Sequence, residues 1–305
     1  MKKNIALAIF MLGLGLSNAQ AEEKKTTTDK KDIDEEITNA RMRAESGSKS
    51  PLSMSLSLGY NGGSLDDPFG KERPNIYADP ENETETSMSG SISGRYRLSK
   101  NDSITVGAGY SVLTPFHHAK GDISNPYIGY SRVYTIAGIQ TITSADLTFG
   151  TKDSYKNQNL DQILGVSQYM MKKFGDSGWT LGASVSASFY FSGGLADSKY
   201  RADFQAKTGQ PFLKDYQTEM AIGLYPQLEY VFNDTFSFRT VFGYFNYQKS
   251  RGKDAKLLRA YEYQSVGVGI SVTRDIYLYP NIQFLADDFD KDKTNFGFSA
   301  TINLF

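Results

Sequence analysis

The chain has 305 residues, with 33 basic and 34 acidic side chains; the formal net charge of −1 argues against a nucleic-acid-binding surface, which needs a basic excess. Cysteine is absent, which excludes disulfides, thiolate metal ligands and cysteine nucleophiles. No apolar run of about 18 residues follows the N-terminal segment, so a bundle of membrane helices is excluded as well. In contrast, 20 Tyr, 19 Phe and 1 Trp in a polar chain with 28 Gly form a composition that membrane β-barrels share.

Residues 1–21 have the organisation of a secretory signal peptide. Lys2 and Lys3 supply the positive start, the stretch from Ile5 to Leu16 is apolar, and the segment ends in the small-residue motif Ala19-Gln20-Ala21. The apolar stretch is too short for a membrane anchor, which needs about 20 residues. We therefore expect cleavage after Ala21, and we expect the protein to be exported in the manner of bacterial secretory proteins.

Residues 22–51 are predicted to be a polar N-terminal extension with a weak helix. The first part, 22–31, has no apolar residue and is expected to be disordered. Asp32 with Glu35 resembles a helix capping box, and Gly47 followed by Pro51 ends the segment. Two interpretations stay open: a solvated periplasmic extension, which the thinness of the apolar stripe favours, and a helix inside a barrel lumen. The stripe consists of Ile33, Ile37, Ala40 and Ala44.

From Leu52 onward, apolar and polar residues alternate with a period of two, which is typical of strands with one apolar and one polar face. The segment 52–60 places Leu, Met and Tyr on one face and Ser and Gly on the other, and 179–191 repeats the pattern. The polar face holds mostly Ser, Gly, Thr and Asn rather than charges. This composition favours an enclosed wet interior over the solvent face of a soluble sandwich, and lipid then meets the apolar face.

The connections between the predicted strands alternate between short and long, as in outer-membrane barrels with short periplasmic turns and longer outer loops. Twelve strands fit this alternation, and counts of ten or fourteen stay open; a single strand over 127–150 would give eleven. An even count places both chain ends on the periplasmic side. The predicted strands are 52–60, 86–98, 103–112, 127–137, 140–150, 160–172, 178–192, 219–232, 235–247, 261–273, 276–286 and 294–305.

Aromatic residues gather near both ends of the predicted strands, as at the two interfaces of a membrane. Trp179 and Phe236 lie near the periplasmic ends, and Tyr60 lies near an outer end. Two prolines are unfavourable for this arrangement, since Pro226 and Pro280 fall inside predicted strands. Proline within a sheet is usually found on an edge strand, and a closed barrel has no free edge. We expect a local irregularity at each of them.

The signal peptide, the period-two strands, the alternating connections and the terminal Phe305 together resemble a Gram-negative outer-membrane β-barrel protein, over about residues 52–305. The resemblance implies an all-β, antiparallel up-and-down barrel in the cell outer membrane, with outer-membrane lipid as a partner. It also implies that the insertion machinery reads the last strand, which ends in Phe305. One departure concerns phase: in the family pattern the apolar residues alternate in phase with the terminal Phe, whereas here Ile302 and Leu304 are out of phase with Phe305.

Neither a catalytic nor a metal site is predicted, and no cofactor. The two histidines, His117 and His118, lie in an expected outer loop, and the His-x-Ser signature of outer-membrane phospholipases is absent. The run from Asp288 to Asp292 has the spacing of a calcium loop but lacks the Gly and the final acidic residue that complete such a site. A solvated hairpin loop is the better interpretation of this run.

Five charged residues fall on the predicted inner wall, where they would shape the ion preference of a pore. They could instead pair with one another and fill the lumen. The favoured function is passive diffusion of small polar solutes; the alternative is a closed structural or surface-interaction barrel that acts through its outer loops. The candidate pore-lining residues are Arg95, Arg97, Asp146, Glu229 and Arg239.

Overall fold

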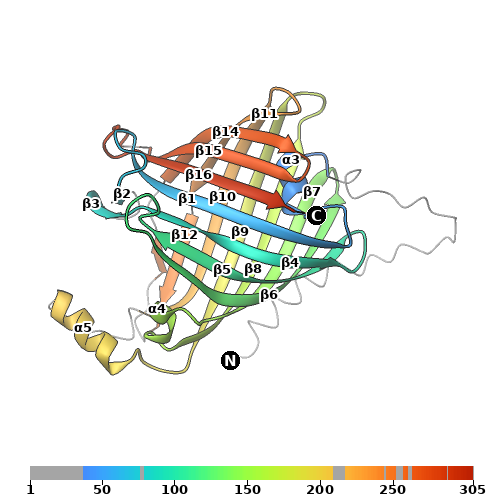
Figure 1. Cartoon of the computed structure of the whole chain (residues 1–305). Coiled ribbons are helices and arrows are strands. Elements are labelled where there is room, and N and C mark those ends of the chain that lie inside the picture. Colours follow the sequence, from blue (N-terminus) through green and yellow to red (C-terminus); the bar gives the residue numbers. More distant parts are fainter. Residues whose placement is uncertain are drawn as a thin grey trace. The chain divides into compact units, whose positions relative to one another are not determined.

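The structure is a computed structural model of the chain, shown in Figure 1. It describes residues 37–75, 79–208, 217–243, 245–251, 257–259, 263–286 and 288–304. The predicted signal peptide, the proposed cap Asp32 and the terminal Phe305 lie outside these ranges. Of the helices that the structure describes, none is long and apolar enough to cross a membrane.

The described strands form a closed antiparallel barrel of twelve strands, as predicted. Each barrel strand pairs with the barrel strands before and after it in the chain, and β16 pairs with β1 to close the ring. Around the barrel, the strands are β1 (Leu52–Ser64), β4 (Ser87–Arg97), β5 (Asp102–Leu113), β6 (Lys120–Ile136), β7 (Ile139–Phe149), β8 (Leu160–Lys173), β9 (Trp179–Ser192), β10 (Thr218–Val231), β11 (Phe236–Gly243), β14 (Tyr263–Thr273), β15 (Ile276–Leu285) and β16 (Asn295–Asn303).

Shorter elements lie in the connections between the barrel strands. β12 (Phe245–Ser250) follows β11 in the chain and pairs with the first half of β10, and β13 (Leu257–Arg259) pairs with β12. β2 (Glu72–Asn75) and β3 (Asp79–Glu85) form a two-stranded sheet of their own between β1 and β4. Three described helices complete the fold: α3 (Ala40–Glu45), α4 (Asp153–Lys156) and α5 (Ser198–Thr208).

The split of 127–150 into two strands is confirmed, because β6 and β7 are joined by only two residues. Ala137 and Gly138 both have positive φ, of 50° and 75°. Such a pair is the signature of a tight hairpin turn whose twist matches that of the strands. The alternation of connections is also confirmed, with short turns at 98–101, 174–178, 232–235 and 274–275.

Alternate side chains point to opposite faces of the barrel wall, and the outer face is apolar and exposed. On β9, Trp179 and Leu181 are 41% and 50% exposed, and Val106 on β5 is 58% exposed. On the inner face of the same strands, Thr180 and Ser103 are buried. The exposed apolar residues are therefore one side of a regular pattern rather than isolated cases.

The two prolines that the sequence places inside strands, Pro226 and Pro280, lie where the ladder is interrupted on one side. Pro226 pairs with Ala183 of β9, but on its other side the pairing of β10 changes from β12 to β11 between Leu224 and Gln227. Pro280 pairs with Phe298 of β16 and has no registered partner in β14. Because proline has no N–H to donate, each interruption falls where a ladder bond cannot form. The expected irregularities are thus present. At Pro226 the register toward β11 and β12 shifts by one residue, whereas the register between β14 and β15 is the same on both sides of Pro280.

Candidate functional site

The inner wall of the barrel is built from small polar residues, as the alternation predicts. Cross-strand pairs such as Ser57 with Ser91, whose hydroxyls lie 3.0 Å apart, and Ser103 with Ser131, at 2.9 Å, hold the wall together. These short side chains leave room inside the barrel. Part of that room is taken by residues 37–48, which include α3 and which we call the lumenal segment (Figure 1).

The helix α3 has its own start and stop signals. Asn39 is the N-cap, and its side-chain oxygen accepts a hydrogen bond from the amide of Met42 at 3.1 Å. After the C-cap Ser46, Gly47 has a φ of 83°, a left-handed conformation that suits glycine. Because a helix of this length, six residues, is not stable by itself in water, contacts with the barrel must hold it.

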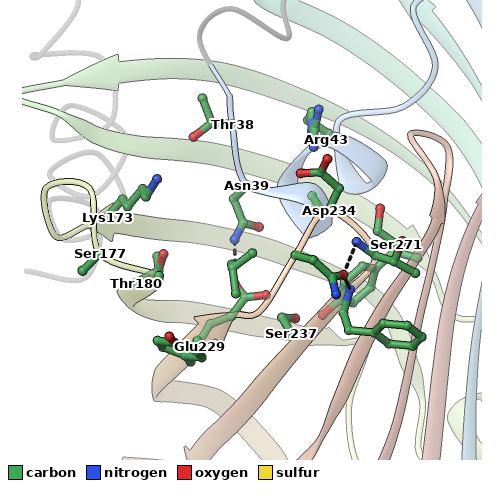
Figure 2. A pocket seen from close by; sticks show the side chains of 18 of the residues that line it. Thr38, Asn39, Arg43, Lys173, Ser177, Thr180, Glu229, Asp234, Ser237 and Ser271 are labelled. Carbon is green, nitrogen blue, oxygen red and sulfur yellow. Dashed lines mark hydrogen bonds between the residues drawn. The ribbon is translucent and has the colours of Figure 1, made fainter.

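At its N-terminal end, the lumenal segment is bound to β7 and β10. The Gln140 side-chain oxygen accepts hydrogen bonds from the amides of Thr38, at 3.0 Å, and Asn39, at 3.2 Å. The Asn39 side-chain nitrogen donates to Glu229 Oε2 at 2.7 Å, as Figure 2 shows. These wall residues therefore satisfy polar groups at a helix start that have no partner within the helix.

At its C-terminal end, side chains of the barrel cap four carbonyl groups of the segment. Free carbonyls at a helix end carry partial negative charge, which favours cationic donors. The barrel thus holds this end more firmly than a helix of this length could hold itself. The donors are Asn303 Nδ2 to the Ala44 oxygen at 2.8 Å, Arg95 Nη2 to Glu45 at 3.1 Å, Arg274 Nη1 to Gly47 at 2.6 Å and Arg97 Nη2 to Ser48 at 2.7 Å.

Apolar contacts fix the segment from two sides. Ile37 and Met42 are fully buried in a cluster with wall residues of β6, β7 and β8. On the opposite side of the helix, Ala44 packs with Tyr277 and Tyr279 of β15. Burying an apolar side chain of the size of Ile or Met contributes about 1.5–3 kcal/mol. The wall members of the first cluster are Val133, Ile142, Tyr169 and Met171.

Arg41 is the centre of a polar cluster inside the lumen. Its guanidinium forms an ion pair with Glu45 at 2.6 Å and lies over the Tyr169 ring, 4.7 Å from the centroid. The same group donates to Gln227 Oε1 at 3.1 Å, and Arg239 donates to that oxygen at 3.0 Å. Gln227 therefore joins the lumenal segment to the charged wall.

The register places all five charged candidates from the sequence on the inner face of the wall. Arg95, Arg97 and Glu229 contact the lumenal segment directly, and Arg239 is connected to it through Gln227. Asp146 is separate: in the described chain, its carboxylate accepts only from Thr148, at 3.2 Å. The interpretation of the described residues 37–48 as solvated is wrong, because the wall offers the short helix both apolar contacts and hydrogen-bond partners.

Several residues that hold the segment are not evident from the sequence. Arg41 and Asn39 lie in a stretch assigned to a weak helix, and the sequence contains one usable signal, an Asn three residues before Met42. Arg274 and Asn303 lie in a turn and at a strand end, where polar residues are ordinary. Their partners are 227 and 259 residues away in the sequence, so no local pattern could reveal them.

Three cavities adjoin the lumenal segment or the wall that holds it. One of about 400 Å³ opens between the start of the segment and the turns after β8 and β10, and is lined by Asn39, Lys173, Glu229 and Asp234 (Figure 2). A second, of about 370 Å³, follows the wall of β4 to β7 and includes Arg95 and Asp146. A third, of about 240 Å³, lies beside Arg41 and Glu45, along β16 and β1.

The other sequence candidates lie in the loops. His117 Nε2 is 3.1 Å from the Phe69 oxygen, in an exposed connection. In the acidic run, Asp288 pairs with Lys293 at 3.1 Å and Asp292 with Lys291 at 3.8 Å. Lys291 also pairs with Asp66 of the loop after β1 at 2.9 Å. Within the residues that the structure describes, no group of three or more His, Asp or Glu could hold a metal ion.

Comparison with known proteins concerns the fold. No protein-family model matches the chain, and no curated protein matches it. The COG4313 outer membrane channel from Pseudomonas putida F1 has a similar structure, with a TM-score of 0.51 at 9% identity over 83% of this chain and 94% of that one. The NanC porin gives a TM-score of 0.42 at 8% identity, over 82% of this chain and 97% of that one. The chain thus has a β-barrel fold similar to that of an outer-membrane channel.

Proposed function

We propose that this protein is an outer-membrane channel through which small polar solutes diffuse passively. The observation that carries the proposal is the division of the wall: the outer face is apolar and exposed, whereas the inner face is lined by hydroxyl, amide and charged groups. Lipid would cover the first and water the second. The fold similarity to a protein described as an outer membrane channel supports this assignment.

The proposal includes the remaining expectations from the sequence. Residues 1–21 would be removed as a signal peptide, residues 22–51 would be an N-terminal extension, and residues 52–305 would form the barrel. With an even strand number, both chain ends would lie at the side of the short turns, which we assign to the periplasm. Insertion machinery would read the C-terminal strand that ends in Phe305, and no enzymatic step is part of the function.

The five charged residues of the inner face would line the water-filled path. Four of them are engaged with the lumenal segment or its partners, so they would act on passing ions mainly through their charge. Asp146 has only the Thr148 hydroxyl as a partner in the described chain and would be the most available to a solute.

A planar lipid bilayer tests the proposal. Refolded protein, with folding checked by heat-modifiable gel mobility, should give stepwise conductance that scales with salt concentration. The lumenal segment narrows the pore, so we expect steps smaller than those of the same barrel without residues 37–48. A folded barrel that gives no conductance would contradict the channel and would favour a closed barrel that acts through its loops.

A further inference from the structure

The cavity along β4 to β7 contains two opposite charges that do not neutralise each other. Arg95, Thr105, Gly129 and Asp146 are consecutive partners in the register of these four strands. They therefore form one row across the inner wall, with a cation at one end and an anion at the other. Two strands separate the charged residues, and no ion pair joins them in the described chain.

The middle of this row is hollow because of its residue types. Gly129 has no side chain, and Thr105 has a short one, so the wall recedes between the two charges. The resulting cavity has a volume of about 370 Å³ and is also lined by Tyr127 and Thr148. This volume lies in the lower part of the range for small-molecule pockets.

Both charged groups have unused hydrogen-bonding capacity. Arg95 uses Nη2 for the Glu45 carbonyl, but its buried Nε and Nη1 have no acceptor among the residues that the structure describes. Asp146 accepts one hydrogen bond, from Thr148, and its carboxylate lies close to Gly165 rather than to a basic side chain. Buried or half-buried charged groups of this kind are normally satisfied, so each of them offers a site for a ligand of opposite charge.

We infer that the Arg95–Asp146 cavity binds small zwitterions, such as free amino acids, as they pass through the channel. A carboxylate would lie toward Arg95, whose planar guanidinium suits such a partner, and an ammonium group would lie toward Asp146. The hydroxyls of Thr105, Tyr127 and Thr148 would accept or donate the remaining hydrogen bonds. This inference rests on the proposed channel and specifies the class of solute that it favours.

Swelling of proteoliposomes tests the inference with L-serine and erythritol, which are similar in size and differ in charge distribution. Both solutes are without net charge, so no membrane potential complicates the comparison. The measured quantity is the ratio of the swelling rate in L-serine to the swelling rate in erythritol. This ratio should be higher for the wild-type barrel than for the Asp146→Asn variant. We expect the ratio to fall about three- to fivefold, as for the loss of an ion pair in a wet site.

Matched variants separate the site from general charge effects. Asp153→Asn removes the same charge from an exposed helix outside the barrel wall and should keep the wild-type ratio. Arg95→Gln should lower the ratio, and Arg95→Lys should restore most of it. Because Arg95 also holds the lumenal segment, Asp146→Asn is the decisive variant. In wild-type protein, L-serine but not erythritol should also cause brief current blockades in a planar bilayer.

The outcomes are distinguishable. An unchanged ratio in Asp146→Asn, with both solutes passing, would overturn the zwitterion site and leave the channel in place. The absence of serine blockades in wild-type protein would also overturn it. If neither solute passes through a folded barrel, both the proposed channel and the site within it are contradicted.

Discussion

Asn303 connects the last strand to the lumenal segment, and its contribution can be measured. Its side chain donates to the Ala44 carbonyl at 2.8 Å and accepts from the Ser55 hydroxyl at 2.6 Å. Asn303→Ala would remove both of these hydrogen bonds, although the Ala44 carbonyl would keep the Gly47 amide as a donor at 3.2 Å. A lost hydrogen bond of this kind costs about 0.5–1.5 kcal/mol. Urea unfolding in detergent micelles should show this loss. Thr301→Ala, on the same strand and face, is the control and should cost little; equal effects of both would contradict the role of Asn303.

Two glycines in different strands test the packing of the wall. A Cβ at Gly267 would collide with the Pro280 carbonyl oxygen, which belongs to the backbone and cannot move freely. Gly267→Ala should therefore destabilise the barrel by about 1–3 kcal/mol. A methyl group at Gly94, on the outer face, would have nothing within 4 Å, so Gly94→Ala should leave the unfolding midpoint nearly unchanged. Similar midpoints for the two variants would contradict this register.

At the scale of single residues, the sequence predicted orientation but not partners. Alternation is a local property, so Arg95, Asp146 and Glu229 could be assigned to the inner face from their neighbours alone. The partner of Glu229 is Asn39, which lies 190 residues away, and the partner of Arg95 belongs to a segment interpreted as solvated. Contacts over such separations depend on closure of the barrel, which no local pattern encodes.

At the scale of elements, removal of the lumenal segment should widen the pore. An α-helix with its side chains is about 10–12 Å across, which is a large share of the interior of a twelve-stranded barrel. Deletion of residues 37–48 should raise the single-channel conductance about twofold or more, since this cross-section then fills with electrolyte. Replacement of α5 by a Gly-Ser linker of equal length is the control and should leave the step size closer to wild type. A deletion that leaves the conductance unchanged would show that ions do not pass the helix.

The loops after β1 and β15 are joined by the Asp66–Lys291 pair, which predicts a pH dependence. The hydrogen bond from Lys291 holds the pKa of the Asp66 carboxyl below its ordinary value of 3.8, and the same bond raises the pKa of Lys291 above 10.5. The stabilisation by Asp66 is complete above about pH 4 and is lost as the pH falls through its lowered pKa. The stabilisation by Lys291 is complete below about pH 10 and is lost as the pH rises through its raised pKa.

Hydrogen exchange at the Leu65 amide measures this effect, because that amide donates to the Lys291 and Thr294 carbonyls at 3.1 and 3.0 Å. The protection factor, corrected for intrinsic exchange, should be flat between these limits and should decrease modestly outside them. In Asp66→Asn, the acidic decrease should disappear. A wild-type protection factor that keeps its value down to about pH 2, below the ordinary range of a carboxyl group, would contradict the loop contact.

The strands were predictable as elements, whereas the helix was not. Each strand presents one face to each environment, so its period of two appears in the sequence without reference to its neighbours. Even the hairpin at Ala137 and Gly138, which lacks a strong turn motif, follows from the requirement for an even strand number. The short helix α3 has a weak pattern because its stability comes from Gln140, Asn303 and arginines of the barrel.

At the scale of the whole molecule, the proposed channel requires lipid on the outer face of the wall and water on the inner face. A chain without cysteine allows this to be measured residue by residue, because every introduced thiol is unique. The strand β9 offers consecutive positions from 181 to 188, of which the odd-numbered ones face outward and the even-numbered ones face the lumen.

Single-cysteine variants at these positions, inserted into lipid vesicles and exposed to a small charged thiol reagent, provide the most direct test. We expect labelling at Ser184, Ser186 and Ser188 and protection at the odd-numbered positions between them, because only the lumen admits water and a charged reagent. The alternation should persist when the vesicle lipid is changed. Equal labelling on both faces, or labelling of the odd-numbered positions alone, would contradict a polar lumen enclosed by a lipid-facing wall.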